Sequence, residues 1–248
     1  MLNFRTMLPR LWAGNRAAGI ATRVFILPVL AFASLPYRAA VGMRNMLYDR
    51  GLLKQTKLPC PVISIGNITV GGTGKTPLAI MVAKLLREKG YRPAVLSRGY
   101  GGAGKALCIV SDGNRVLATA TVAGDEPLLI AQSLMDVPVL TGADRIRTGA
   151  YAIRELAADV LILDDAFQHR RLFRDLNIVL LREKKPFGNG RLLPRGPLRE
   201  PLSALKRADI LVLTAGTRKT GETVAGPYLP PVPQFRGSYR PTALRCKG

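Results

Sequence analysis

The sequence predicts an α/β fold in which helices flank a mostly parallel β-sheet, and two observations predict it. Short runs rich in Val, Ile and Leu alternate with longer segments whose apolar residues repeat at helical spacing. A glycine-rich turn separates the first such run from the first such helix. Because parallel strands must be joined by crossover segments, usually helices, this alternation indicates a doubly wound sheet.

The elements follow in order from residue 61. Residues 61–65 form the first predicted strand, and residues 77–90 a helix that ends where Gly90 can act as C-cap. The next predicted strands are residues 93–97, 137–140, 160–163, 177–181 and 209–213. Further helices are predicted at residues 126–135 and 144–158. Residues 226–241 are rich in proline and lack periodicity, which is typical of a linker.

The charge of the chain is unusual for its ordinary composition. In 248 residues, 37 Lys and Arg stand against 16 Asp and Glu, a formal net charge of +21. Nucleic acid, an anionic membrane face or a phosphorylated substrate would each suit this charge. Three cysteines far apart and a single histidine argue against a Cys/His zinc site and for reduced thiols in the cytosol.

An uncharged, largely apolar run covers residues 24–37, with arginines on both sides. It is shorter than the roughly 20 residues that cross a bilayer as a helix. We favour a helix in the membrane interface, with the arginines on anionic headgroups. A buried core helix and a cleaved signal peptide are the alternatives. Pro28 and Pro36 are expected to kink or end the helix.

The glycine-rich turn has the pattern and context of a P-loop, because it lies between a predicted strand and a predicted helix. Its backbone N–H groups would hold phosphate oxygens, Lys75 would bridge the β- and γ-phosphates, and Thr76 would hold Mg²⁺. Thr69 stands where the strict pattern has its first glycine. The candidate nucleotide-binding residues are Thr69, Val70, Gly71, Gly72, Thr73, Gly74, Lys75 and Thr76.

Carboxylates and glycine-rich segments follow other strands. Asp164 and Asp165 end an apolar strand, as in the Mg²⁺-binding Walker B strand of such sheets. Three further segments fit either anion binding or catalysis, or else plain turns, caps and loops. They are residues 97–102, residues 124–127 and the Gly-, Pro- and Arg-rich residues 188–201.

Taken in order, these segments resemble one family, the tetraacyldisaccharide 4'-kinases, which are lipid A pathway kinases of Gram-negative inner membranes. The similarity covers residues 66–77, 97–102, 124–127, 163–169 with 174–176, and 188–201. It implies a P-loop NTPase-like fold and phosphorylation, by ATP with Mg²⁺, of a sugar hydroxyl on a lipid A disaccharide precursor. It also implies a peripheral or monotopic enzyme on the cytoplasmic face of the inner membrane, in contact with anionic lipid.

The resemblance also implies roles for individual residues. Asp125 would be the base for the 4'-hydroxyl, and Asp164 and Asp165 would be the metal-side carboxylates. Lys75 and Asp165 would act in catalysis and Asp164 with Thr76 in metal binding. Residues that would shape the substrate or phosphate environment are Arg145, Glu200 and His169.

Two departures from the family pattern concern Ala166, where the family has glycine, and the length of the chain. Family members continue into a C-terminal domain, so an active kinase and a catalytically incomplete fragment are both expected possibilities. We divide the chain into a membrane-associated helical segment, a kinase domain, and a Pro-rich tail that begins that further domain. These are residues 1–50, 51–225 and 226–248.

Other function classes fit the sequence less well. P-loop switch ATPases that act through dimerisation carry a lysine where this chain has Val70. A nucleic-acid-binding protein would suit the charge, but the sequence has no recognisable recognition module. We therefore expect a monomeric kinase with no nucleic-acid partner.

Overall fold

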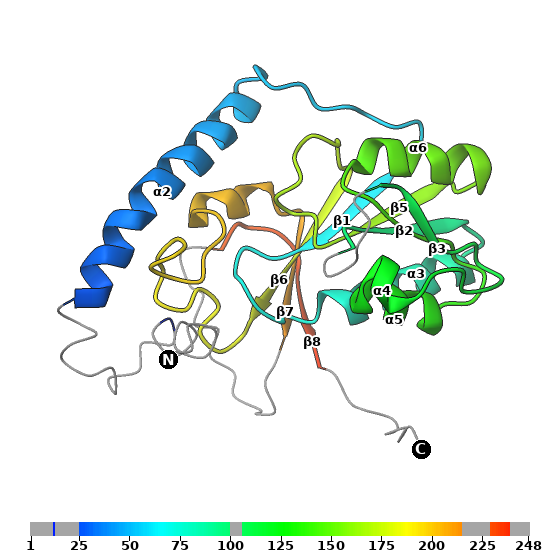
Figure 1. Ribbon diagram of the computed structural model, residues 1–248. Coiled ribbons are helices and arrows are strands. Elements are labelled where there is room, and N and C mark those ends of the chain that lie inside the picture. The colour runs from blue at the N-terminus through cyan, green and yellow to red at the C-terminus, as the bar shows by residue number, and fades with distance from the viewer. Residues whose placement is uncertain (1–11, 13–24, 100–105, 215–228, 239–248) are drawn as a thin grey trace.

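An eight-stranded sheet forms the centre of the computed structural model, which describes residue 12 and residues 25–99, 106–214 and 229–238 (Figure 1). Its strand order is β3-β4-β2-β5-β1-β6-β7-β8, and only the edge strand β3 is antiparallel to its neighbour. The predicted mostly parallel α/β fold is therefore confirmed. The strands are β1 (Val62–Gly66), β2 (Pro93–Ser97), β3 (Cys108–Ser111), β4 (Val139–Thr141), β5 (Val160–Asp164), β6 (Leu176–Arg182), β7 (Ile210–Thr214) and β8 (Gln234–Gly237).

Helices cover both faces of the sheet. Alternate residues of the central strands point to opposite faces, so Ile178 and Leu180 pack under the α3 side while Val179 and Leu181 pack under η2. The helices α3 (Lys75–Glu88), α4 (Ala120–Ala123) and α5 (Asp125–Ser133) lie on one face, and α6 (Arg145–Glu155) and the 3₁₀ helix η2 (Leu202–Arg207) on the other. Because both faces are buried, the strands read as continuous apolar runs, as in other parallel sheets.

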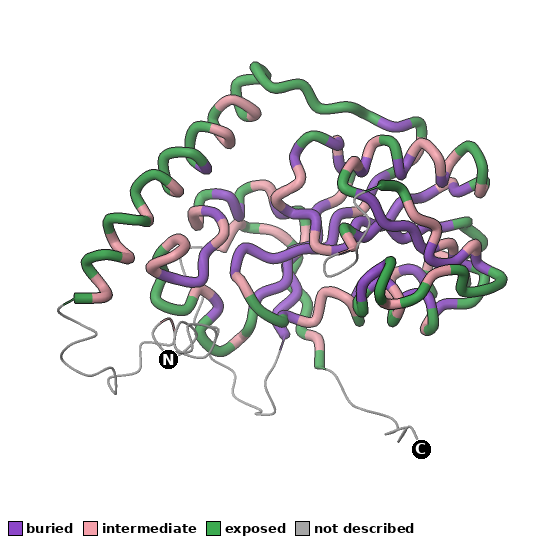
Figure 2. Tube along the Cα trace, in the orientation of Figure 1, coloured by how far each residue is buried: buried purple, intermediate pink, exposed green. Residues whose placement is uncertain are grey.

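Helix α2 (Leu27–Asp49) stands beside this α/β body (Figure 1). Figure 2 shows it as largely exposed or intermediate along its length, and among its residues only Val41 is buried. Of the two outcomes expected for Pro36, a kink or an end of the helix, the end is excluded, because Pro36 lies inside α2. Pro36 is exposed, so the hydrogen bond that it removes faces solvent, and the helix-forming Ala, Leu, Met and Arg residues on both sides carry the helix on.

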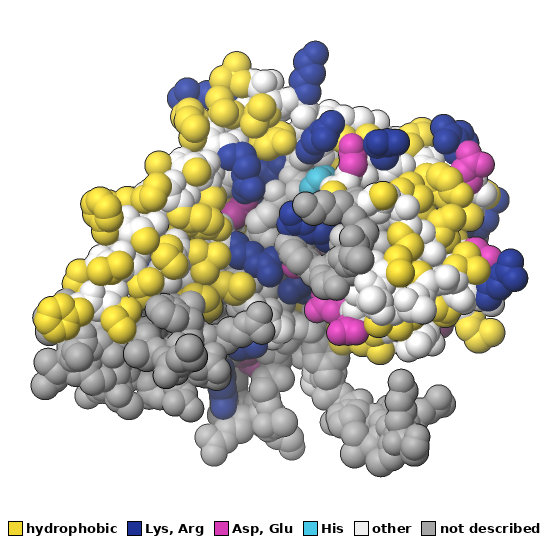
Figure 3. Space-filling model, viewed as in Figure 1, with side chains coloured by type: hydrophobic (Ala, Val, Ile, Leu, Met, Phe, Trp, Pro, Cys, Tyr) yellow, Lys and Arg dark blue, Asp and Glu magenta, His cyan; other side chains and the backbone are white. Residues whose placement is uncertain are grey.

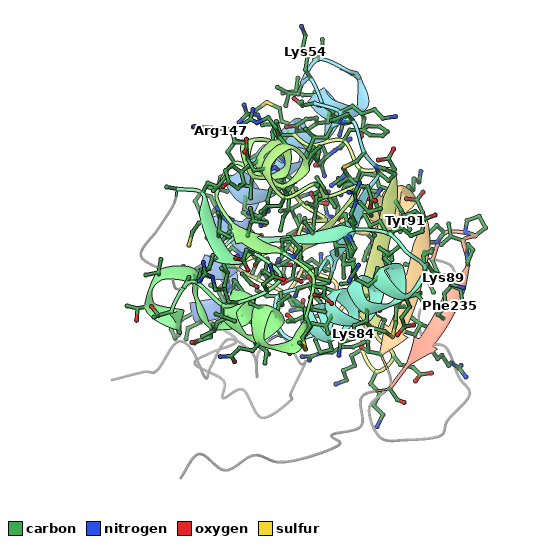
Figure 4. All side chains as sticks on the ribbon, turned by 90° about the vertical axis from the view of Figure 1, so that its right-hand side faces the viewer. Lys54, Lys84, Lys89, Tyr91, Arg147 and Phe235 are labelled. Carbon is green, nitrogen blue, oxygen red and sulfur yellow. The ribbon has the colours of Figure 1, made fainter. Side chains whose placement is uncertain are left out.

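The sequence pattern does not predict two of the strands, β3 and β8, and both lie at edges of the sheet. β3 has only four residues, and β8 lies within the proline-rich segment that was read as a linker. β8 pairs in parallel with β7 and leaves Phe235 57% exposed. Figure 4, which faces the side away from α2, shows Phe235 on this edge strand, and the outward-pointing side chains of Lys84 in α3 and of Lys89, which follows α3.

Several expectations fall partly or wholly on residues that the structure does not describe. The loop at residues 97–102 is described only as far as Gly99. Most of residues 1–24 and the last ten residues of the tail also lie outside the described ranges. Predicted helix and strand ends elsewhere differ from the structure by up to three residues, as at α6, which ends at Glu155 rather than at residue 158.

Gly66 provides a test of how closely β1 and the end of β5 must approach. A Cβ atom on Gly66 would lie 2.6 Å from the Cβ of Phe167 and 2.8 Å from its backbone nitrogen. Because backbone cannot move aside cheaply, we expect Gly66→Ala to lower the free energy of unfolding by about 2–4 kcal/mol. Urea-induced unfolding measures this.

Gly42→Ala is the matched control for this measurement. A Cβ there meets nothing within 4 Å, and Gly42 lies inside α2, so alanine should be neutral or stabilise slightly. Equal unfolding free energies for the unsubstituted chain and Gly66→Ala would contradict the close approach at Gly66.

Candidate active site

Residues 69–76 connect β1 to α3 at the carboxyl edge of the sheet, where ligands of open α/β sheets bind. Gly74 precedes the first turn of α3 with φ 83°, and Gly71 has φ 109°. Both values lie in the left-handed region that favours glycine. Gly71 and Gly72 are exposed, so the loop before α3 presents accessible backbone to a ligand. The predicted P-loop context is thus present.

Side chains from other segments hold this loop in shape. The Arg182 guanidinium, at the end of β6, donates to the Gly72 carbonyl through Nε at 3.1 Å and Nη2 at 2.6 Å. The buried Asn67 amide donates to Thr73 Oγ1 at 3.1 Å. On the other side, the Val70 N–H donates to the Pro197 carbonyl at 2.8 Å. The loop is therefore fixed to two neighbouring segments before any ligand binds.

Lys75 and Asp165, which the resemblance assigns to catalysis, lie close together. The Lys75 Nζ atom lies 3.6 Å from Asp165 Oδ1. Asp165 also accepts hydrogen bonds from Arg199 Nη1 at 2.9 and 3.0 Å on its two oxygens. It follows β5 with φ 50°, an unusual value for a non-glycine residue and one that clusters at functional sites.

Asp164, the last residue of β5, lies beside Ile65 of β1 and is 1% exposed. Its Oδ1 atom has no hydrogen-bond partner within the described part of the chain. Burial, then the nearby carboxylates of Asp165 and Glu126, raise its pKa to about 7, although Lys75 and Arg145 oppose this. A buried carboxylate in this state is suited to accept a cation.

These residues fit the predicted Mg²⁺ site. Thr76 lies in the first turn of α3 and Asp164 carries an unpaired oxygen toward the same edge of the sheet. Among the described residues no three His, Cys, Asp or Glu side chains form a cluster that could hold a metal. Mg²⁺ is commonly held by one or two carboxylates together with substrate phosphates and water, so a sparse protein site is what this ion requires.

His169 belongs to the turn that follows β5. Arg174 Nη1 donates to the carbonyls of Ala166, Phe167 and His169 at 3.0–3.3 Å, which fixes this turn. Burial and then the Arg145 guanidinium lower the pKa of His169 to about 4. Its Nε2 atom is buried and has no hydrogen-bond partner among the described residues.

Arg145 is 3% exposed and begins α6, whose first turn is capped by the Asp144 carboxylate. The Arg145 guanidinium donates to the Gly142 carbonyl and acts electrostatically on both Asp164 and His169. The structure therefore brings these three predicted residues into one region.

Two other predicted site residues, Asp125 and Glu200, are not in this group. Asp125 is exposed at the N-terminus of α5, and it is the adjacent Glu126 that acts on Asp164. Glu200 is fully buried between the guanidinium groups of Arg44 and Arg207. Its direct partners therefore belong to α2 and η2 rather than to the P-loop.

Three residues that contact this site were not singled out in the sequence: Arg199, Arg182 and Asn67. The segment at residues 188–201 was identified for its arginines, but nothing in it distinguished Arg199 from its neighbours. Arg182 immediately follows the predicted strand at residues 177–181 and is the last residue of β6, the neighbour of β1, and Asn67 immediately follows β1. Polar residues at the carboxyl ends of neighbouring strands were the available signal.

A cavity of about 470 Å³ opens beside the P-loop. It is lined by the first residues of the P-loop, by residues from the end of β6 onward, and by Trp12. These residues are Trp12, Thr69, Val70, Gly71, Arg182, Lys184, Lys185, Pro186, Gly188 and Pro197. In Figure 3, Lys and Arg side chains also gather along the groove between α2 and the α/β body. The site is thus strongly positive around its phosphate-binding loop.

The chain is similar to known proteins over most of its length. The family model of tetraacyldisaccharide-1-P 4'-kinase (LpxK) matches residues 26–247. The tetraacyldisaccharide 4'-kinase of Syntrophus aciditrophicus is 52% identical over 98% of this chain and 68% of its own length. That of Anaeromyxobacter sp. strain Fw109-5 is 51% identical over 84% of this chain and 56% of its own length.

A solved structure is similar as well. LpxK from Aquifex aeolicus, crystallised in complex with ATP, is 42% identical with a TM-score of 0.75, over 86% of this chain and 64% of that one. The chain spans between about half and two thirds of the length of most of these relatives.

The low pKa of His169 can be tested directly, because it is the only histidine of the chain. We expect its imidazole NMR resonances to show no titration from pH 8 down to pH 5. In the unfolded chain, His169 takes up a proton near the ordinary pKa of 6.5. The free energy of unfolding should therefore fall as the pH falls from 6.5 toward 4. A titration midpoint near 6.5 in the folded chain would contradict the burial of the ring.

Proposed function

The chain belongs to the tetraacyldisaccharide-1-P 4'-kinase family, and we propose that it transfers the γ-phosphoryl group of ATP to the 4'-hydroxyl of a tetraacyldisaccharide 1-phosphate. One observation carries this proposal. The P-loop lysine Lys75 lies beside Asp165, next to the buried carboxylate of Asp164, at the carboxyl edge of the sheet. This is the arrangement that phosphoryl transfer requires of a P-loop enzyme.

The P-loop would bind the phosphates of ATP. The exposed backbone of Gly71 and Gly72 and the N-terminus of α3 are suited to phosphate oxygens, and Lys75 would pair with the β- and γ-phosphates. Lys75 now pairs with Asp165, which keeps Arg199 as a second partner. Lys75 can therefore turn to a phosphate without leaving an unpaired carboxylate behind. The cavity beside Val70 and Arg182 would take the nucleoside.

Thr76 and Asp164 would hold Mg²⁺, which when bound neutralises phosphate charge during the transfer. With Asp164 committed to the cation, Asp165 is the carboxylate left to orient Lys75 and Arg199. Asp125 is our proposed base for the acceptor hydroxyl, and its exposure at the N-terminus of α5 leaves it accessible to a substrate.

The acceptor would lie near Arg145 and His169. A substrate that already carries a 1-phosphate is anionic, and the groove of Figure 3, with its Lys and Arg side chains, is suited to such a group. The neutral imidazole of His169 can take part in hydrogen bonding without adding charge. Glu200 would act indirectly, because it pairs with Arg44 of α2 and Arg207 of η2, which lie on the two sides of this groove.

We also propose that the protein is peripheral to the membrane and that α2 is its contact with the lipid. No helix in the described ranges is long and apolar enough to cross a bilayer. The outer side of α2 nevertheless exposes an apolar row, visible in Figure 3, and an apolar row of this kind with nearby arginines is typical of interfacial helices. The large exposed side chains are Phe25, just before the helix, and Val29, Phe32, Leu35, Met43 and Met46.

Phosphoryl transfer tests the proposed reaction. We expect the chain to transfer labelled phosphate from ATP to a tetraacyldisaccharide 1-phosphate in detergent micelles, and Lys75→Ala to lower kcat/KM about 100-fold or more because a charged contact to the transferred group is lost. Lys84→Ala, on the exposed side of the same helix (Figure 4), should leave the rate unchanged. Transfer that survives Lys75→Ala at full rate would refute the P-loop mechanism.

Flotation with vesicles tests the role of α2. Phe32 is 78% exposed, so Phe32→Asp should not disturb the core but should weaken binding to anionic phospholipid vesicles about 10-fold or more. Phe235→Asp makes the same change on β8, away from α2, and should bind like the unsubstituted chain. Equal losses of vesicle binding in both variants would contradict the proposal that α2 is the membrane contact.

A further inference from the structure

Helix α2 rests on the body through one of its faces. Tyr37, Val41 and Arg44 are spaced so that they share this face, and Val41 is its buried member. The Tyr37 hydroxyl donates to the Arg199 carbonyl at 2.8 Å, and the Arg44 guanidinium pairs with the Glu200 carboxylate. The helix therefore contacts two successive residues of the segment that precedes η2.

A cavity lies on each side of these contacts between α2 and the body. A cavity of about 500 Å³ lies between the first half of α2 and residues 190–202, and one of about 530 Å³ lies between its second half and η2. Pro201 lines both of them. Near the end of α2, Arg170 pairs with Asp49 at 2.7 Å as a further attachment. Contacts at Arg199 and Glu200 thus fix the middle of the helix.

One of these two residues, Arg199, also reaches the nucleotide site. The Arg199 N–H donates at 2.7 Å to the carbonyl of Ile68, the residue before the P-loop. The Arg199 guanidinium holds Asp165, which pairs with Lys75. A continuous series of contacts therefore runs from Tyr37 on α2 through Arg199 to the P-loop lysine.

The Glu200 carboxylate is a second link between α2 and the segment that carries Arg199. It is fully buried, with Arg44 on one side and Arg207 on the other. Displacement of α2 at Arg44 would take away one of the two cations that compensate this buried carboxylate and leave only Arg207, so it should disturb the backbone that also carries Arg199. The position of α2 and the geometry of Arg199 are then not independent.

We propose that Tyr37 and Arg44 are positioning residues of the nucleotide site, so that α2 sets the affinity for ATP in addition to contacting lipid. This inference rests on the proposed function in taking ATP as the ligand. Tyr37 acts on the Arg199 carbonyl and Arg44 on Glu200, and both act on Lys75 through Asp165. Because coupling between two binding events is reciprocal, lipid bound to α2 should change ATP affinity by the factor by which ATP changes lipid affinity.

ATP affinity of the full chain tests the proposal, and the chain supplies its own probe. Trp12 is the only tryptophan and lines the cavity beside the P-loop, so its fluorescence should report nucleotide binding. We expect Tyr37→Phe to raise the Kd for ATP about 5-fold, which corresponds to the loss of one hydrogen bond. Arg44→Gln should raise it further, and Arg44→Lys should restore part of the loss because it keeps the charge opposite Glu200.

Tyr48→Phe is the matched control, because it removes a hydroxyl from the same helix while its ring stays over the Arg170 guanidinium. It should leave Kd unchanged, and all four variants should float with vesicles like the unsubstituted chain. The proposal is overturned if Tyr37→Phe and Tyr48→Phe bind ATP equally well. It is also overturned if ATP affinity falls only in variants that lose vesicle binding or thermal stability.

The outcomes separate this proposal from the proposed function. If the unsubstituted chain binds ATP but transfers no phosphate, the kinase proposal fails, while the Kd values still decide the role of α2. If the unsubstituted chain does not bind ATP at all, both proposals fail. A KM for ATP that rises in Tyr37→Phe while the KM for the lipid acceptor stays constant would support the positioning role specifically.

Discussion

The Asp165 carboxylate is shared between two cations, Lys75 of the P-loop and Arg199 of the segment before η2. These residues are far apart in the chain, and this one side chain joins the segments that carry them. It follows β5 in an unusual backbone conformation that the surrounding contacts must maintain. If Asp165 were removed, two cations would lie close together without a counter-charge, so the shape of the site depends on it.

Backbone packing places Asp165 where it can do this. β1 and β5 are neighbours in register, with Ile65 beside Asp164, so their carboxyl ends emerge together. Because Gly66 has no side chain, the backbone of Phe167 can lie directly against the end of β1. Arg174 then holds the turn that carries His169 through three carbonyls. The sheet thus brings the two acidic residues and the P-loop together before any ligand is bound.

The sequence predicted the fold and the position of the P-loop between a strand and a helix, because both depend on local patterns. Continuous apolar runs revealed the buried parallel strands, and the glycine spacing revealed the loop that contains Lys75. The family resemblance is confirmed by the family model and by relatives at about 50% identity. The edge strands β3 and β8 were not predicted, since short edge strands carry little hydrophobic signal.

Long-range contacts were the other part that could not be predicted. Nothing local to Glu200 shows that Arg44, 156 residues earlier in the chain, is its partner. Arg199 could not be told apart from the other arginines of its loop until the fold placed Asp165 beside it. The continuation of α2 past Pro36 could not be predicted either, because a proline on the exposed side of a helix costs less than one on its buried side, and local sequence does not show which side is exposed.

The buried histidine has a consequence for the electrostatics of the whole molecule. Histidine is the side chain that ordinarily changes charge near neutral pH, and the single histidine here is held neutral down to about pH 4. The excess of 37 basic over 16 acidic side chains therefore stays nearly constant across physiological acidity, with Asp164 as the main exception. Attraction to anionic surfaces is then governed by ionic strength, whose screening length is about 8 Å in physiological salt, rather than by pH.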